Sequence, residues 1–82
     1  MVAFVAPGRG EVAFVAGRRV GGAVVRNRAR RVVRAAWRDL APQARKGFDV
    51  AWVARGTIRG AKTQDLVPEM EALLKRAQVI PR

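Results

Sequence analysis

The sequence contains no cysteine and no histidine. Without cysteine, the chain cannot form disulfide bonds, thiolate zinc sites or a cysteine nucleophile. Without histidine, it lacks the commonest general base and metal ligand of proteins. Acidic residues are also few, and no spacing among them is typical of a catalytic carboxylate pair; they are Glu11, Asp39, Asp49, Asp65, Glu69 and Glu71. The sequence therefore offers no self-contained catalytic site and no metal site of its own, and another molecule must supply the chemistry if the chain takes part in catalysis.

Long apolar runs are absent as well. No stretch approaches the roughly 18 apolar residues that cross a bilayer. Met1–Ala6 is too short for a secretory signal and lacks its charged start. The expected compartment is therefore the cytoplasm. The length allows one small domain, residues 1–82, and because half of the residues are apolar this domain can form a core.

Positive charge, in contrast, is in large excess. The chain has 17 Lys and Arg against 6 Asp and Glu, a formal charge of +11 and a pI near 12. Eight arginines lie between Arg18 and Arg38, with no acidic residue among them. Because like charges this close repel one another, the segment indicates a polyanionic partner, most often a nucleic acid and less often an anionic membrane.

The same segment predicts an amphipathic helix from about Ala23 to about Leu40, begun near Gly22 and ended by Ala41-Pro42. At roughly 100° per residue, one side is apolar and suits a core; it carries Val25, Ala29, Val32, Val33, Ala36 and Leu40. The opposite side carries Ala23, Asn27, Arg30, Arg31, Arg34 and Arg38. This second side suits the phosphates of RNA, since guanidinium groups pair with two phosphate oxygens at once.

Three strands are predicted around this helix. Val2–Ala6 and Val12–Ala16 are the same pentapeptide, VAFVA, and the short Pro- and Gly-rich loop between them indicates a β-hairpin. Phe48–Arg55 alternates and is the third strand. With a final helix, the order is β-β-α-β-α, an α+β sandwich with the helices on one face of the sheet.

The final helix is predicted from apolar residues three and four apart, Leu66, Met70, Leu73, Leu74 and Ala77. Because proline fits badly in a helix interior, Pro68 is expected in the first turn, or the helix starts slightly late. Val79–Arg82 is expected to be a frayed tail.

Aromatic side chains are candidates for stacking on unpaired bases. Phe4 is equally compatible with an open sheet face and with a core. For Trp52, in the middle of an apolar strand, core packing is favoured. Trp37, at the border between the two sides of the helix, is expected to pack as well.

The predicted RNA-binding residues are Arg18, Arg19, Arg26, Asn27, Arg28, Arg30, Arg31, Arg34 and Arg38. Asn27 either orients a base, sugar or metal-bound water, or is an ordinary surface residue. Besides binding to one specific RNA, two other functions remain open at this point. One is general RNA binding, for example by a ribosome-associated protein, and the other is binding to a membrane surface through a basic helix.

A family resemblance narrows these alternatives. Residues 19–34, RVGGAVVRNRARRVVR, resemble the signature of the bacterial ribonuclease P protein subunit. That signature has a basic pair, Val-Gly-Asn-Ala-Val, Arg-Asn-Arg, a second basic pair, two apolar residues and Arg. Residues 47–55 and residues 73–77 also resemble the family's later strand and last helix. The resemblance covers most of the chain.

The resemblance implies a partner, a reaction and a fold. Family members bind a catalytic RNA, which with its Mg²⁺ ions removes the 5′ leader of precursor tRNA. No membrane and no obligatory protein partner are implied. The arginines and Asn27 would face the catalytic RNA, and an open sheet face would hold the single-stranded leader through Phe4, Val12 and Phe14. The implied fold is that of the second domain of ribosomal protein S5, with a left-handed β-α-β crossover.

Three departures from the family are visible; the minor one is Ala35, which stands where an acidic or polar residue is common. Members usually begin with a further helix, whereas this sequence begins at the first strand, so the start lies upstream or the chain is a shortened version. Gly22 stands where Asn is usual, which predicts a weaker cap on the arginine-rich helix.

Overall fold

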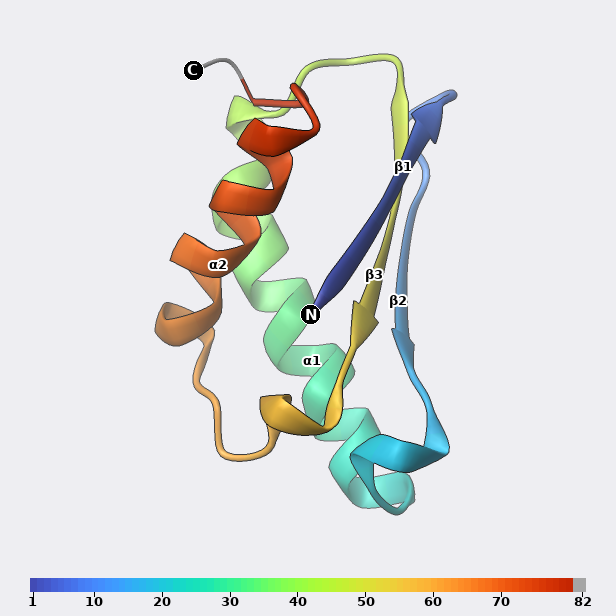
Figure 1. The fold of residues 1–82 in the computed structure, drawn as a ribbon, viewed down its shortest axis with the longest axis vertical. Coiled ribbons are helices and arrows are strands. Elements are labelled where there is room, and N and C mark those ends of the chain that lie inside the picture. Colours follow the sequence, from blue (N-terminus) through green and yellow to red (C-terminus); the bar gives the residue numbers. More distant parts are fainter. Residues whose placement is uncertain (81–82) are drawn as a thin grey trace.

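In the computed structural model, which describes residues 1–80, three strands form a sheet and two helices cover one of its faces (Figure 1). The strands are β1 (Val2–Pro7), β2 (Val12–Ala16) and β3 (Phe48–Ala54), and the helices are α1 (Ala23–Leu40) and α2 (Thr63–Arg76). Short 3-10 turns, Arg18–Val20, Ala41–Gln43 and Gly56–Ile58, connect them. The predicted α+β fold and the β-β-α-β-α order are confirmed. None of the helices in these 80 residues is both long and apolar enough to cross a membrane.

The predicted hairpin of the first two strands is wrong. The strand order is β1-β3-β2, so β3 separates the two copies of VAFVA. β3 pairs antiparallel with β1 and parallel with β2. Two strands and a short loop favour a hairpin on local grounds, but here β3 supplies a hydrogen-bonding edge to each of them. The loop between β1 and β2 therefore passes over the end of β3.

Asp49, near the start of β3, holds this loop in place. Its carboxylate accepts hydrogen bonds from the backbone N–H groups of Gly10 (3.0 Å) and Glu11 (2.9 Å). The N–H of Gly8 donates to the carbonyl oxygen of Gly47 at 2.8 Å. A Cβ atom at Gly8 would lie 2.0 Å from an oxygen of Asp49, so a larger residue would displace this carboxylate.

Replacing Gly8 by alanine is expected to lower the free energy of unfolding by about 1–3 kcal/mol, because the carboxylate of Asp49 must move and release its backbone donors. Chemical denaturation followed by circular dichroism measures the change. Gly17→Ala is the matched control, since Gly17 has a φ of −80° and a Cβ atom added there would meet nothing within 4 Å. Equal stability of the two variants would contradict the role of Asp49.

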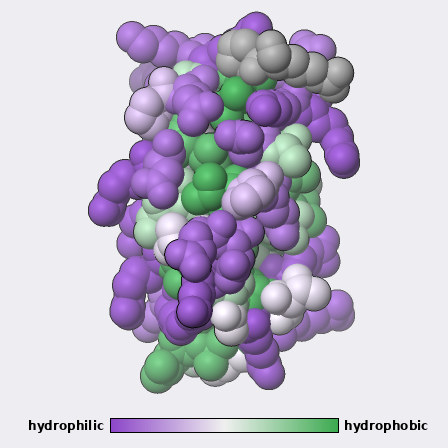
Figure 2. All heavy atoms as spheres, turned by 90° about the vertical axis from the view of Figure 1, so that its left-hand side faces the viewer, coloured by the Kyte–Doolittle hydropathy of each residue, from purple (hydrophilic) through white to green (hydrophobic). Residues whose placement is uncertain are grey.

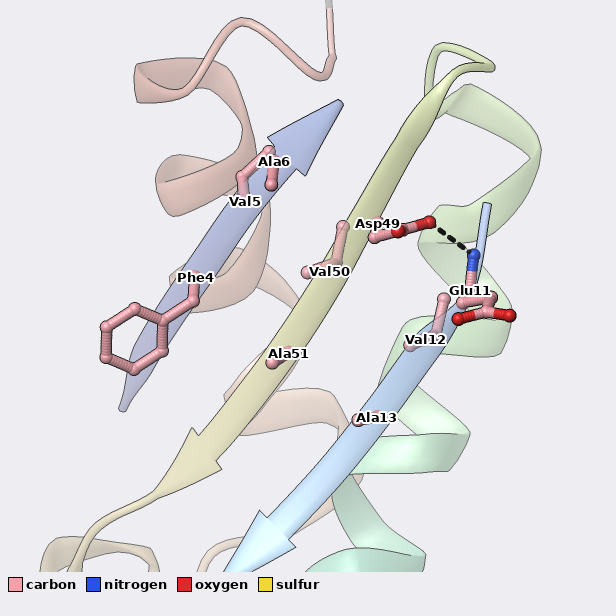
Figure 3. Close-up of a pocket in the computed structure, with 9 residues that line it drawn as sticks. All are labelled: Phe4, Val5, Ala6, Glu11, Val12, Ala13, Asp49, Val50 and Ala51. Carbon is pink, nitrogen blue, oxygen red and sulfur yellow. Dashed lines mark hydrogen bonds between the residues drawn. The ribbon is translucent and has the colours of Figure 1, made fainter. Parts of the chain in front are cut away.

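Helix α1 connects the parallel strands β2 and β3. Seen from the open face of the sheet, with the helices behind, both strands run downwards and β3 lies to the left of β2 (Figure 3). The crossover is therefore left-handed, as the family resemblance implies, although such connections are almost always right-handed. This connection puts the long basic helix behind β2.

The core lies between the sheet and the helices. Trp52 of β3 is fully buried, and its ring centroid lies 5.9 Å from that of Trp37 in α1, which confirms the packing predicted for both. The buried residues of the helices are Ala29, Val33, Ala36 and Leu40 of α1 and Leu66, Met70 and Leu74 of α2. Val25, expected on the core side of α1, is instead 38% exposed.

Helix α2 begins earlier than its proline suggests. Pro68 is the sixth residue of the helix and is exposed, so its expected place in the first turn is wrong. The start is set by Asp65, whose side chain accepts a hydrogen bond from the N–H of Lys62 (2.9 Å). The N–H of Asp65 in turn donates to the carbonyl oxygen of Lys62 (2.9 Å). This reciprocal cap and the burial of Leu66 outweigh the one hydrogen bond lost at the proline.

The chain after α2 folds back on the core. Gln78 has a φ of 63°, which ends the helix, and Val79 and Ile80 are then almost completely buried. The carbonyl oxygen of Val79 accepts a hydrogen bond from the N–H of Arg45 (2.7 Å). The expected frayed tail is therefore wrong for these two residues, and its last two positions, residues 81–82, lie outside the described residues.

Candidate nucleic-acid interface

Helix α1 presents a line of basic side chains on the side opposite the core. We call this surface the basic face; it consists of Asn27, Arg28, Arg30, Arg31, Arg34 and Arg38. All are exposed except Arg30, which is half-buried. Among residues 1–80, none of these arginines lies within 4.0 Å of a carboxylate oxygen. The positive charge of the basic face is therefore not neutralised within the chain.

Several side chains of the basic face are held in position by neighbours. The guanidinium of Arg34 lies over the ring of Phe14, 5.2 Å from its centroid. Arg28 donates from Nη2 to the carbonyl oxygen of Ala61 (3.0 Å), and Arg30 donates from Nη2 to Oδ1 of Asn27. Such contacts reduce the side-chain entropy that is lost when a ligand binds.

The remaining predicted RNA-binding arginines lie elsewhere. Arg18 and Arg19 are exposed in the turn before α1. Arg26 is half-buried, and its Nε atom is buried with no hydrogen-bond partner in the described chain. The structure therefore brings six of the nine predicted residues together on the basic face. Two others, Arg18 and Arg19, lie in the turn before α1, and Arg26 is half-buried on the helix itself.

The cap of α1 is as weak as the sequence predicts. Gly22 is the N-cap residue and makes no side-chain hydrogen bond to the first turn. No acidic residue lies in that turn either. The helix is stabilised instead by the four residues that it buries against the sheet and α2.

The other face of the sheet is open. A groove of about 560 Å³ runs over it, which we call the sheet groove (Figure 3). Its lining residues are Phe4, Val5, Ala6, Glu11, Val12, Ala13, Asp49, Val50 and Ala51. Phe4 is 63% exposed, so an aromatic ring is available on this face.

The three residues expected on the open face do not share it. Phe4 is aligned with Ala51, whereas Phe14 is aligned with Trp52, which points into the core. Since neighbours in register project to the same side of a sheet, Phe14 faces the helices and packs against the core. Val12 is aligned with the buried Val50 and also packs against the core, although it borders the groove. The placement of Phe14 on the open face is thus wrong.

A second hollow continues the open face at the far ends of β2 and β3. It has a volume of about 350 Å³, and the open-face residues Val15 and Val53 line it together with Arg18, Arg19 and Arg55. The opposite end of the sheet carries Glu11 and Asp49. Arg55 was not among the predicted RNA-binding residues, because it follows an apolar strand and only the turn brings it near Arg18 and Arg19. The lining of the open face therefore changes from two carboxylates at one end, with Arg9 and Lys46 close to them in the chain, to three arginines at the other end.

The outer side of α2 has a different character. It carries three of the six acidic residues, Asp65, Glu69 and Glu71, and Glu71 pairs with Lys75 at 3.4 Å. Hydrophilic side chains cover most of the helical side of the molecule, with smaller hydrophobic areas between them (Figure 2). In residues 1–80 no three side chains of the His, Cys, Asp or Glu type gather as metal ligands. Uncompensated positive charge is thus concentrated on α1.

Comparison with known sequences identifies related proteins. The family model described as Ribonuclease P matches residues 1–78. The chain is 41% identical over 71 residues to the ribonuclease P protein component of Symbiobacterium thermophilum, which covers 87% of this chain and 62% of that protein. It is 45% identical over 69 residues to the ribonuclease P protein component of Chloroflexus aurantiacus, and the match covers 83% of this chain and 51% of that protein. The chain thus spans about half to three fifths of the length of these relatives.

Solved structures show the same fold. The RNase P protein of Staphylococcus aureus superimposes with a TM-score of 0.77 at 20% identity, over 95% of this chain and 74% of that one. The RNase P protein of Thermotoga maritima superimposes with a TM-score of 0.76 at 23% identity, over 90% and 74%.

Proposed function

Because this chain belongs to the bacterial ribonuclease P protein family, we propose that it is the protein subunit of a ribonuclease P ribonucleoprotein. In this role it binds the catalytic RNA in the cytoplasm and assists removal of the 5′ leader from precursor tRNA. The observation that carries the proposal is the basic face, whose arginines have no acidic partner in the described chain. Three of them, Arg28, Arg30 and Arg34, are held in position by neighbouring groups.

The basic face binds the phosphate backbone of the catalytic RNA. Each guanidinium offers two parallel donors to a phosphate, and each contact releases counterions from the RNA. Asn27 accepts a hydrogen bond from Arg30 and so acts first as a positioning residue for that guanidinium. Its amide N–H₂ group remains free to donate to the RNA.

The open sheet face holds the single-stranded leader. Phe4, on the edge strand β1, supplies a stacking surface at one side of the sheet groove (Figure 3). Phosphates of the leader are attracted to Arg18, Arg19 and Arg55. These arginines place the charged backbone of the leader towards the end of the sheet from which α1 begins.

The protein supplies binding and orientation, and the hydrolytic chemistry belongs to the RNA partner with its Mg²⁺ ions. We assign no Mg²⁺ ligands to this chain, since no cluster of carboxylates in the described residues fits the ion. The arginines of the basic face assist the RNA by screening its phosphates, so that a compact active form needs less Mg²⁺.

Reconstitution with a bacterial ribonuclease P RNA tests this function. Cleavage of precursor tRNA is measured at low Mg²⁺ concentration, with and without the protein, and stimulation is the expected result. Tight and specific binding to that RNA without stimulation would contradict the leader-binding role. Absence of both, with equal affinity for unrelated RNA at about 150 mM salt, would leave only general RNA binding, because nonspecific phosphate binding weakens steeply with salt.

A further inference from the structure

A third hollow lies between the first turns of α1 and the loop before α2, and we call it the helix groove. Its volume is about 490 Å³, and its lining residues are Val24, Val25, Arg28, Ala29, Ile58, Arg59 and Gly60. It shares none of these residues with the sheet groove or with the hollow beside Arg55. The helix groove is therefore separate from the proposed leader site.

The apolar lining of the helix groove includes two valines that the fold leaves exposed beside the buried Ala29 and Ile58. Val24 is 82% exposed and Val25 is 38% exposed, although the four core residues of α1 are at most 2% exposed. Neither valine belongs to the cluster of buried core residues. Their apolar surface is thus available to a ligand.

The rim of the helix groove is basic and rigid. Arg59 donates from Nε to the carbonyl oxygen of Val20 (2.6 Å), and Arg28 donates from Nη2 to the carbonyl oxygen of Ala61 (3.0 Å). Each guanidinium keeps further N–H donors for a ligand. No acidic residue lines the groove. An apolar lining beside two cations, each held by a hydrogen bond, matches a nucleotide, which joins a flat apolar base to an anionic phosphate.

The helix groove is also continuous with the basic face. Val24, Arg28 and Arg31 follow one another at spacings of four and three residues, so they lie along one line of α1. An RNA strand that contacts Arg31 therefore passes the mouth of the groove. A second copy of this chain is a poor occupant, because its own basic rim would be brought against Arg28 and Arg59.

We propose that the helix groove receives an unpaired nucleobase of the RNA bound by α1, with the base against Val24 and Val25 and its phosphates on Arg28 and Arg59. This inference rests on the proposed function and extends it by adding a base contact to the phosphate contacts of the basic face. Phosphate contacts give affinity that depends on salt, whereas burial of a base against apolar side chains gives affinity that does not.

The test compares the wild-type protein with the variant Val24→Ser/Val25→Ser in binding to a bacterial ribonuclease P RNA over a range of salt concentrations. The variant is expected to bind about tenfold more weakly, while the slope of log affinity against log salt stays unchanged. Arg28→Gln, in contrast, is expected to reduce both the affinity and the slope. Ala72→Ser, at an exposed position on α2, is the matched control and should behave as wild type.

Chemical modification of the RNA bases adds a second measurement. An unpaired base protected by the wild-type protein should become reactive with the Val24→Ser/Val25→Ser variant. Since both valines lie outside the core, thermal unfolding should be unchanged. If the variant keeps the affinity and the base protection of the wild type, the base contact is overturned and the proposed function stays intact. The same holds if the variant binds RNA normally but no longer associates with another protein. Failure of the wild type itself to bind this RNA specifically would overturn the proposed function and the base contact together.

Discussion

Replacing Arg30, Arg31 and Arg34 together by glutamine is expected to lower the affinity for ribonuclease P RNA by about 100-fold at 150 mM salt. Each lost phosphate contact reduces the slope of log affinity against log salt by about 0.7–0.9, so three contacts reduce it by about 2–3. At 150 mM salt, this slope corresponds to a loss of about fivefold in RNA affinity for each phosphate contact removed. Fluorescence anisotropy with labelled RNA at several salt concentrations measures both quantities.

The control for this experiment removes the same charge elsewhere. The triple variant of Arg45, Lys46 and Arg76 to glutamine also lowers the formal charge from +11 to +8, but these exposed residues lie outside the basic face. It is expected to lose only a few-fold in affinity, mainly through a slower association rate. Equal losses in the two triple variants would show that overall charge, and not the arrangement of the basic face, determines RNA binding. Arg34 also stacks on Phe14, so unfolding of both variants is measured as well.

Replacing Trp52 by alanine is expected to reduce the free energy of unfolding by about 3–5 kcal/mol. The side chain is 0% exposed at the centre of β3, and its removal leaves Trp37 without its aromatic neighbour. A domain of this length has a total stability of roughly 4–12 kcal/mol. The variant therefore loses a large part of its stability, and a considerable fraction unfolds on mild heating.

Circular dichroism is the suitable probe for Trp52→Ala, because the substitution removes one of the two tryptophans from the fluorescence signal. Trp52→Phe keeps most of the buried volume and should lose markedly less stability. Added RNA is expected to raise the melting temperature of both variants, since the folded state alone carries the assembled basic face. A change below about 1 kcal/mol for Trp52→Ala would contradict the central place of this residue in the core.

Local patterns in the sequence predict the helices and strands and indicate a polyanionic partner. Apolar residues three and four apart are enough to predict α1 within a residue at each end, because helical periodicity is a local property. The density of arginine without acid in the same segment predicts the polyanionic partner, since charge repulsion depends only on which residues are close in the chain. The signature in residues 19–34 led directly to the family.

The surfaces that these elements form depend instead on how the strands and helices pack against one another. The two VAFVA strands have identical sequences, so they do not predict which strands pair. Hydrogen bonds between strands join backbone groups, and the backbone of β3 can pair with either of them. That pairing put Phe4 on the open face and Phe14 under Arg34, although both occupy the same place in the VAFVA repeat. It also brought Arg55 next to Arg18 and Arg19, and the loop before α2 next to Val24. Such proximity joins residues distant in the chain, so it depends on packing between elements, which local patterns do not encode.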